Sequence, residues 1–321
     1  MIRLAFSDHY PAFDPKASRL YRSLSAATPV QLCEMSESPD LLVYGDFGRA
    51  HWAFEGLKAY VTGENMKPDF DQCDLAFTPF EIAGDDRSVR LPFYAQVLED
   101  TTKLLGRASA GHRRELAEGF CSFVVSNPRS WPRNRFFKKL NRRRRVDSGG
   151  SLFNNVGGRV HDKSRFIASH RFNIAFENTE TDGYITEKLT DPLLADTIPI
   201  YWGAPDVLRD FNADCFIHAR DFASLDDLAD FVIALEADHE RQLRYLTASA
   251  FRDGKLPAGL TDEYVSAPIL KLLSSGRPGK RIYRDRRVRE HVYQGRSWLA
   301  NKWERIGCRF EEQAWKLGWR L

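Results

Sequence analysis

A buried strand, a polar loop, a helix start and a second buried strand follow one another between residues 172 and 203. The first strand is expected at 172–176, and the helix is expected to begin at Thr186 after the loop. The second strand begins near Pro199 and ends at a glycine turn. This order predicts one parallel crossover unit, and ligands of such units bind beyond the carboxyl ends of the strands. The helix start also offers free backbone N–H groups and the positive end of its dipole to an anion.

The side chains on this loop and helix start suit a sugar that is attached to a diphosphate. Lys188 adds a point charge at the helix start, where a phosphate would lie. Asn178, Tyr184 and Glu187 can hydrogen-bond hydroxyl or amide groups. Pro192 lies inside the expected helix and lacks an N–H group, so the helix either kinks or ends there.

The segment FENTETDGYITEKL, residues 176–189, resembles the donor-binding signature of the α-1,3/4-fucosyltransferases, glycosyltransferase family ten, in the bacterial form associated with Lewis antigens. Three further stretches agree with that family in order and character, and they are AYVTGEN at 59–65, RLPFY at 90–94 and SFVVSNPRSWPRNRFFKKLN at 122–141. The resemblance covers about the central half of the chain. It implies an α/β protein of the GT-B fold, in which two Rossmann-like domains face each other across a cleft.

The length of 321 residues allows two domains of ordinary size. We expect an acceptor-side α/β domain at 1–112, a nucleotide-sugar donor domain at 113–275 and a basic amphipathic helical tail at 276–321. Apolar runs and helical periodicity predict the individual elements. Strands are expected at 2–6, 41–44, 57–62, 75–78, 120–126 and 215–218, helices at 95–105, near 136–140 and after an N-cap at Ser224, and a polar linker at 106–118.

Composition indicates a soluble globular protein, with 43% hydrophobic and 28% charged residues. No apolar run is long enough to span a bilayer, and the first residues lack the pattern of a secretory signal. The five cysteines are odd in number and scattered, which favours reduced thiols in a cytosol over a disulfide framework or a cysteine metal site. We therefore expect a cytoplasmic protein.

The resemblance also implies roles for particular residues of the donor site. In the family pattern, the arginine of the Pro-Arg-Asn segment and the lysine of the Tyr-x-Thr-Glu-Lys segment contact the phosphates, and these positions correspond to Arg133 and Lys188. Asn178, Tyr184 and Glu187 correspond to residues that line the rest of the donor pocket. A simpler interpretation is that Arg133 belongs to a solvated basic face and that Glu187 and Lys188 only occupy a helix start.

Glu64 follows a predicted strand and corresponds to the proposed catalytic glutamate of the family. Burial in a closing site would raise the pKa of such a carboxyl group toward the working range of a base. The simpler interpretation is a turn glutamate. Direct attack by an activated hydroxyl would invert the anomeric centre. No Asp-x-Asp metal site is evident at a strand end, so we expect a metal-independent reaction without a cofactor.

The function expected from the resemblance is transfer of L-fucose from GDP-fucose to the 3-hydroxyl of N-acetylglucosamine in an N-acetyllactosamine-type glycan. One alternative is a related transferase that uses another nucleotide sugar. A second alternative is a non-enzymatic protein that binds nucleic acid or an anionic surface. The donor residues favour the enzyme, so no nucleic-acid partner is expected.

Two basic segments keep the second alternative open. The run from Arg133 to Arg145 contains eight Lys and Arg residues, which fit a solvated helix face or a nucleic-acid patch. Residues 276–321 hold thirteen Lys and Arg residues against five Asp and Glu residues. At 298–321 an apolar stripe adjoins a basic stripe, which favours attachment to the anionic inner face of the cytoplasmic membrane over docking on the catalytic domains.

Overall fold

The computed structural model describes residues 1–108 and 116–275. Its first part contains a parallel sheet in which the strands at 41–44 and 75–78 are almost continuous apolar runs, as expected for strands covered on both faces. The predicted strands at 41–44 and 75–78 are confirmed with those bounds, and every residue in both is buried. The strands are β1 (Ile2–Ser7), β2 (Val30–Leu32), β3 (Leu41–Tyr44), β4 (Lys58–Val61), β5 (Leu75–Thr78) and β6 (Ser88–Arg90), and the helices of this part are α1 (Arg19–Ala27), α2 (Phe93–Val97) and α3 (Thr102–Leu105).

The single helix predicted at 95–105 is wrong, because α2 and α3 are separate short helices. The backbone becomes extended at Leu98, where ψ is 112°, and α2 ends there. The Asp100 carboxylate then accepts hydrogen bonds from the N–H group and the hydroxyl of Thr102 at 2.8 and 2.5 Å. A short side chain that satisfies nearby backbone donors in this way competes with helix continuation and begins a new helix.

The second part contains another parallel sheet with helices on both sides. The predicted N-cap at Ser224 is confirmed, since its hydroxyl accepts a hydrogen bond from the N–H group of Asp227 at 3.1 Å. The strands are β7 (Gly119–Phe123), β8 (Asp147–Ser148), β9 (His170–Phe176), β10 (Ile198–Trp202) and β11 (Ile217–His218), and the helices are α4 (Trp131–Arg143), α5 (Lys163–Ala168), α6 (Glu187–Leu194), α7 (Leu225–Glu236), α8 (His239–Thr247) and α9 (Asp262–Ser275).

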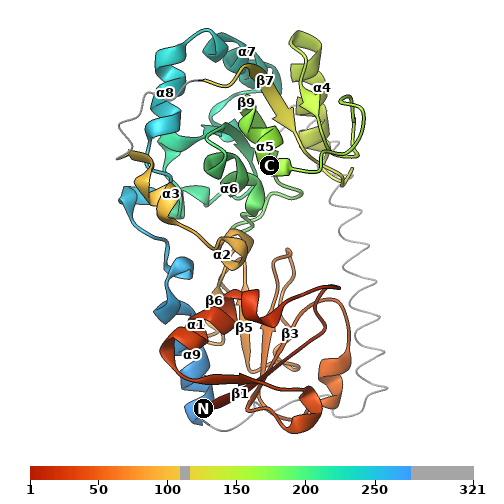
Figure 1. Ribbon diagram of the computed structural model, residues 1–321, viewed down its shortest axis with the longest axis vertical. Coiled ribbons are helices and arrows are strands. Elements are labelled where there is room, and N and C mark those ends of the chain that lie inside the picture. Colours follow the sequence, from red (N-terminus) through yellow and green to blue (C-terminus); the bar gives the residue numbers. More distant parts are fainter. Residues whose placement is uncertain (109–115, 276–321) are drawn as a thin grey trace.

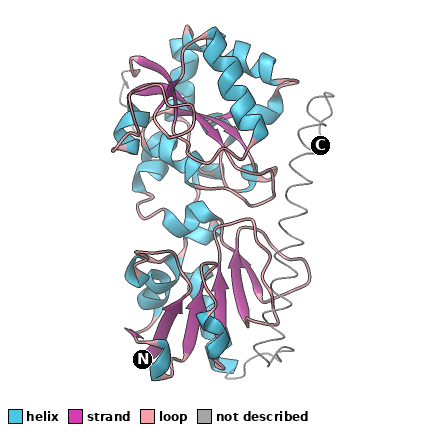
Figure 2. Ribbon diagram, turned by 90° about the vertical axis from the view of Figure 1, so that its right-hand side faces the viewer, coloured by secondary structure: helices cyan, strands magenta, loops and turns pink. Residues whose placement is uncertain are grey.

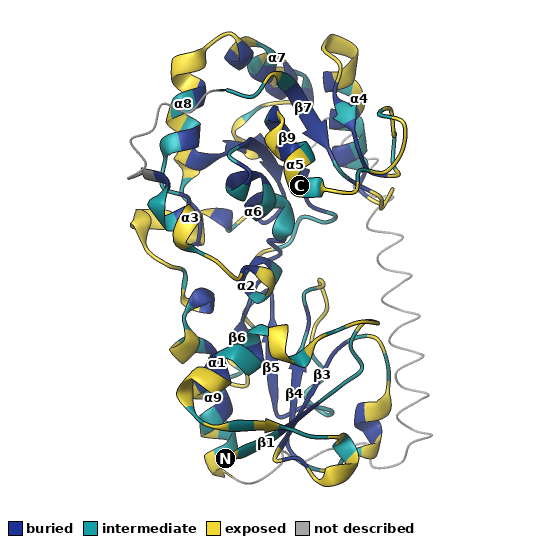
Figure 3. Cartoon of the chain, viewed as in Figure 1, coloured by how far each residue is buried: buried dark blue, intermediate teal, exposed yellow. Residues whose placement is uncertain are grey.

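Within these residues the first sheet has the strand order β2-β1-β3-β4-β5-β6, and the second has the order β11-β10-β9-β7-β8. All strand pairs in both sheets are parallel. The first sheet lies below the second in Figures 1 and 2, and α2 lies between the two parts. In Figure 3 the strands of both sheets are mostly dark blue, while yellow segments lie on outer helix faces and loops. The predicted pair of Rossmann-like domains is confirmed.

Helix α6 settles the alternatives left open by Pro192. The helix contains eight residues and ends at Leu194, two residues after the proline. The N–H group of Thr197 then donates to the carbonyl of Pro192 at 2.9 Å and closes the turn into β10. Pro192 therefore lies near the end of a short helix, where its missing N–H group interrupts little of the helix.

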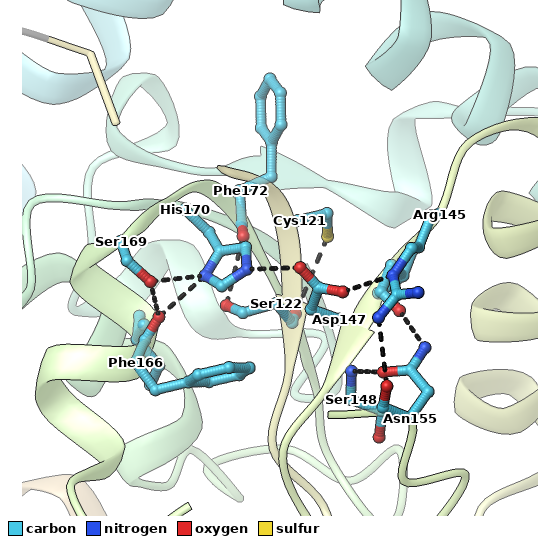
Figure 4. A network of polar contacts seen from close by, with 12 residues as sticks. Cys121, Ser122, Arg145, Asp147, Ser148, Asn155, Phe166, Ser169, His170 and Phe172 are labelled. Carbon is cyan, nitrogen blue, oxygen red and sulfur yellow. Dashed lines mark hydrogen bonds and ion pairs between the residues drawn. The ribbon is translucent and has the colours of Figure 1, made fainter. Parts of the chain in front are cut away.

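The short edge strand β8 is fastened to the second sheet by a polar network (Figure 4). Asp147 accepts a hydrogen bond from Arg145 Nε at 2.8 Å and faces His170 Nε2 at 3.2 Å. The other ring nitrogen of His170 lies 2.8 Å from the carbonyl of Phe166. The side-chain oxygen of Asn155 accepts a further bond from the N–H group of Ser148 at 2.8 Å.

The same arginine belongs to the basic run, and four of its eight cations are paired with carboxylates of the same domain: Lys139, Arg143, Arg144 and Arg145. Arg143 bonds Asp226 and Asp230 on α7 at 2.9 and 2.7 Å. Arg144 pairs with Glu236 at 2.5 Å. These ion pairs favour the solvated helix face over the nucleic-acid patch, because paired cations attract a polyanion less.

Helix α9 returns from the second part of the chain to the first and packs against α1 (Figure 1). Its first residue, Asp262, accepts a bond from the hydroxyl of Ser23 at 3.0 Å and pairs with Arg19 at 3.1 Å. The predicted linker at 106–118 is also partly packed, since Arg107 is fully buried and donates to the carbonyl of Leu193 at 2.6 Å. The boundary expected near residue 112 lies outside the described residues.

Two expectations from composition can be compared with the structure. Four cysteines, Cys33, Cys73, Cys121 and Cys215, are free thiols. In the described part of the chain, no helix is long and apolar enough to cross a bilayer. Cys308 and the amphipathic tail at 298–321 lie outside the described residues.

A glycine fixes the contact between the loop before α6 and the first sheet. Gly183 has φ at +73°, and a Cβ atom there would lie 2.0 Å from the carbonyl oxygen of Pro79. Its N–H group donates to Asp206 at 2.6 Å. At Gly183 the backbone of the donor loop therefore approaches the backbone at Pro79 more closely than a residue with a side chain would allow.

We predict that Gly183→Ala lowers the free energy of unfolding more than Gly157→Ala does. Gly157 has a similar φ of +85° but open space around its Cβ position, so it controls for the left-handed backbone alone. The clash at Pro79 should add about 1–3 kcal/mol to the roughly 1 kcal/mol that the backbone costs. Urea unfolding of both variants measures the difference, and equal losses would contradict the proposed clash.

Candidate active site

The loop that joins β9 to α6 brings most of the predicted donor residues to the carboxyl end of the second sheet. Thr186 is the N-cap of α6, and its hydroxyl accepts a hydrogen bond from the N–H group of Lys188 at 3.3 Å. Glu187 and Lys188 therefore occupy the first turn, as predicted. A helix start in this position favours a bound anion.

A buried carboxylate that the sequence analysis did not single out holds this helix start. Glu177 is fully buried, and one of its oxygens accepts a bond from the N–H group of Thr186 at 2.7 Å. Both oxygens also accept from the Thr186 hydroxyl, at 3.0 and 2.8 Å. The absence of a side chain at Gly203 provides the space for Glu177, since a Cβ atom at residue 203 would lie 2.4 Å from the Glu177 side chain. Burial raises the pKa of Glu177, and its partners act in the opposite direction.

Lys188 lies between two carboxylates at the helix start. Its ammonium group is 3.3 Å from Glu177 and 3.5 Å from Glu187, and its side chain keeps 19% of its surface exposed. Burial lowers the pKa of Lys188, but the two carboxylates outweigh that effect and the net direction is upward. Burial raises the pKa of Glu187, whereas Lys188 and Lys163 lower it below its ordinary value overall. Both groups therefore stay charged at neutral pH.

Arg133 lies behind the loop with no exposed surface. Its guanidinium group donates to the side-chain oxygen of Asn178 at 2.6 Å and to the carbonyl of Asn127 at 2.6 Å. Its Nε is buried without a hydrogen-bond partner. Burial lowers the pKa of Arg133 to about 10, although the charge of Glu177 acts in the other direction. Arg133 therefore orients Asn178 and adds positive potential from beneath the site.

Tyr184 connects the donor loop to the first domain. Its hydroxyl donates to the Glu64 carboxylate at 3.4 Å across the junction of the two domains. Burial raises the pKa of Tyr184, and the Glu64 carboxylate raises it further, so the hydroxyl stays protonated as a donor. Asn65, the next residue, donates to the hydroxyl of Thr181 at 2.9 Å. The predicted base thus lies beside the predicted donor pocket.

Glu64 stands on a turn that a second, partly buried carboxylate supports. Its N–H group donates to the hydroxyl of Thr62 at 3.0 Å, and that hydroxyl donates to Asp46 at 2.6 Å. Asp46 also accepts from the hydroxyl of Tyr60. Burial raises the pKa of Asp46, and these two hydrogen bonds oppose the rise. The Glu64 carboxylate itself is exposed.

The structure brings all six predicted residues to one place, and it adds Glu177, Thr186 and Asp46. Glu177 and Thr186 belong to the motif already singled out, so their positions were visible, but their burial was not. Asp46 follows a strand that was predicted correctly, and its position just after that strand was the feature of the sequence that could have indicated a place in the site. No group of three or more His, Cys, Asp or Glu residues at 1–108 and 116–275 is arranged to hold a metal ion.

Such an arrangement is typical of the nucleotide-sugar glycosyltransferases with the GT-B fold, because a cationic helix start and a carboxylate from the opposite domain meet at the junction. Comparisons with known proteins narrow this class. The family model for the N-terminal domain of α-(1,3)-fucosyltransferase FucT matches residues 4–97. The family model for the C-terminal part of glycosyltransferase family 10 (fucosyltransferase) matches residues 116–253. The chain belongs to glycosyltransferase family 10.

Individual relatives agree with this assignment. The chain is 32% identical to the α-(1,3)-fucosyltransferase FucT of Helicobacter pylori in an alignment 277 residues long, which covers 75% of this chain and 58% of that protein. It is 33% identical to human α-(1,3)-fucosyltransferase 7 over 139 residues, or 41% of this chain and 38% of that protein. A crystal structure of an α1,3-fucosyltransferase with GDP-fucose superposes with a TM-score of 0.71 at 29% identity, covering 85% of this chain and 90% of that one.

We predict that in Glu177→Gln the affinity for GDP begins to fall at a lower alkaline pH than in the unmodified protein. We call this fall of affinity at high pH the alkaline limb. The amide keeps the shape of the side chain but removes the charge that raises the pKa of Lys188, so the ammonium group should lose its proton at a lower pH. Because only the charged ammonium group attracts a diphosphate strongly, affinity should begin to fall earlier on the alkaline side. Calorimetry across an alkaline pH series measures this limb.

Glu236→Gln provides the control, since Glu236 is another buried glutamate with arginine partners but lies away from α6. Its alkaline limb should match that of the unmodified protein. An unchanged limb in Glu177→Gln would show that Glu177 does not set the charge of Lys188.

Proposed function

We propose that the protein is an inverting, metal-independent α-1,3-fucosyltransferase that moves L-fucose from GDP-fucose to the 3-hydroxyl of N-acetylglucosamine in a lactosamine-type, Lewis-antigen-like glycan. Membership of family 10 and the likeness to a structure with GDP-fucose support the donor. The observation that carries the proposal is the 3.4 Å contact between Glu64 and Tyr184, which joins the base candidate to the donor loop.

The donor end of the reaction needs positive charge where the leaving diphosphate develops negative charge. Lys188 and the start of α6 supply it from one side, and the buried Arg133 supplies potential from beneath. Glu187 would accept hydrogen bonds from ribose or sugar hydroxyls, and Asn178 and Tyr184 would complete the pocket. These cations offer a way to stabilise the diphosphate without a bound metal.

The acceptor end needs a base that takes a proton from the attacking hydroxyl. Glu64 is exposed and stands on a turn held by Thr62 and Asp46, so its carboxylate can meet a sugar from solvent. One displacement by that hydroxyl would convert a β-linked donor into an α-linked product. No covalent intermediate is required for this route.

The related transferase with another nucleotide sugar remains the second candidate, and calorimetry with GDP against UDP separates it from the first. The direct test of the proposal is incubation with GDP-fucose and N-acetyllactosamine, with and without a chelator, and assignment of the new linkage by NMR. Formation of α-1,3-linked fucose in both samples is expected. An absolute requirement for a divalent metal would exclude the metal-independent route.

We predict that Lys188→Ala and Glu64→Gln separate binding from chemistry. Loss of the ammonium group should weaken GDP binding roughly 10- to 100-fold, the value of a hydrogen bond to a charged group. Glu64→Gln should keep GDP affinity and lose transfer roughly 10²- to 10⁴-fold. Calorimetry and transfer kinetics are the two measurements.

Lys103→Ala is the matched control for the lysine, because it removes an ion pair with Asp196 beyond the other end of α6 at 2.9 Å. Its GDP affinity should be unchanged. Retained turnover in Glu64→Gln would remove Glu64 from the mechanism, and unchanged affinity in Lys188→Ala would exclude the donor pocket described here.

Location also belongs to this proposal. Cytoplasmic residence stays a prediction from the scattered cysteines and the first residues of the sequence. Attachment of residues 298–321 to the inner face of the cytoplasmic membrane stays a prediction from their basic and apolar stripes.

A further inference from the structure

Two large aromatic side chains lie exposed at the carboxyl edge of the first sheet. Tyr10 follows β1 and is 53% exposed, and Phe47 follows β3 and is 65% exposed. Their ring centroids are 6.2 Å apart and their planes meet at 79°. Tyr10 also packs edge-on against Phe13 at 5.6 Å, and Phe13 stacks on His9 at 3.9 Å. The two rings lie together on the surface and do not contribute to the core.

The backbone beneath these rings is fixed by contacts between the two loops. The N–H group of Phe47 donates to the carbonyl of Asp8 at 2.8 Å. The Asp8 carboxylate accepts from the N–H groups of Ala50 and His51 at 2.8 and 2.9 Å and lies 2.6 Å from the His51 ring. A Cβ atom at Gly48 would lie 2.3 Å from that carboxylate. The aromatic pair is therefore presented on ordered backbone, which keeps the entropy cost of binding low.

The pair stands on the same edge as the predicted base. The strands β1, β3 and β4 are neighbours, with Ser7 paired to Tyr44 and Tyr44 paired to Tyr60. Glu64 follows β4, so two strand spacings, roughly 10 Å, separate its edge position from that of Tyr10. A sugar chain whose reacting unit lies at Glu64 would extend over this distance with its next unit.

Hydrogen bonds also connect Glu64 to the residue next to Phe47. Asp46, the residue before Phe47, accepts from the hydroxyl of Thr62 at 2.6 Å. The same hydroxyl accepts from the N–H group of Glu64 at 3.0 Å. The base and the aromatic pair are thus held in one bonded unit of the first domain.

We propose that Tyr10 and Phe47 bind a pyranose unit of the glycan acceptor next to the unit that reacts at Glu64. The C–H groups on one face of a pyranose are apolar and weakly positive, and the faces of aromatic rings are apolar and weakly negative. The ring hydroxyls stay in solvent or reach the tyrosine hydroxyl. This inference rests on the proposed function and adds the surface that selects the acceptor.

The experiment compares Phe47→Ala and Tyr10→Ala with the unmodified protein in two assays. In saturation-transfer NMR with GDP present, N-acetyllactosamine should receive saturation from the unmodified protein and less from either variant. In transfer kinetics each variant should raise the KM for the acceptor roughly 5- to 20-fold. The KM for GDP-fucose and the affinity for GDP should not change.

Matched variants separate ring contact from structural damage. Tyr10→Phe and Phe47→Trp keep an aromatic face and should retain near-normal acceptor KM. Leu256→Ala removes an exposed apolar side chain of the second part of the chain, 37% exposed, and should change neither KM.

Three results would overturn the proposal: no saturation of lactosamine by the unmodified protein, an unchanged acceptor KM in both alanine variants, or equal rises in the KM values of acceptor and donor. Loss of self-association in Phe47→Ala, seen by size exclusion, would assign the rings to a contact between copies and would also overturn it. Absence of GDP binding by the unmodified protein would contradict the proposed function itself, so the two failures are distinguishable.

Discussion

The buried carboxylate of Glu177 is the interaction on which the arrangement of the site depends. A fully buried charge is costly unless donors surround it, and here the Thr186 backbone, the Thr186 hydroxyl and the Lys188 ammonium group all do so. These contacts fix the N-cap of α6 and the position of its first turn together. One carboxylate thereby holds the start of the helix and helps to raise the pKa of the lysine beside it.

The junction between the domains rests on a second set of buried charges. Arg90 donates to Asp210 at 3.1 Å and Tyr94 donates to the same carboxylate at 2.9 Å, and all three side chains are buried. Together with the close approach at Gly183, this cluster explains why the RLPFY motif at 90–94 accompanies the donor motif in the sequence: its arginine and tyrosine bind the second domain. Removing one partner would leave an unpaired buried charge, so the junction resists separation.

The sequence predicted what depends on local pattern and missed what depends on distant packing. The bounds of β3 and β5 followed from continuous apolar runs, and the start of α7 followed from Ser224. The helix at 95–105 was wrong because periodicity continued across Asp100, whose carboxylate instead caps Thr102. The return of α9 to α1 could not be foreseen, since Asp262 and Ser23 are 239 positions apart. Arg133 was assigned to a phosphate contact from its place in a motif, and its complete burial behind Asn178 depends on the strand and loop that cover it.

The two sheets meet through their carboxyl edges, and each edge has a different chemical character. The edge of the second sheet presents a helix start and Lys188, with Arg133 buried beneath, which suits a charged leaving group. The edge of the first sheet presents Glu64 and two exposed aromatic rings on backbone fixed by Asp8 and Asp46, which suits a neutral sugar. Because Glu64 of the first domain contacts Tyr184 of the second, the reacting atoms would meet at the junction between these two edges.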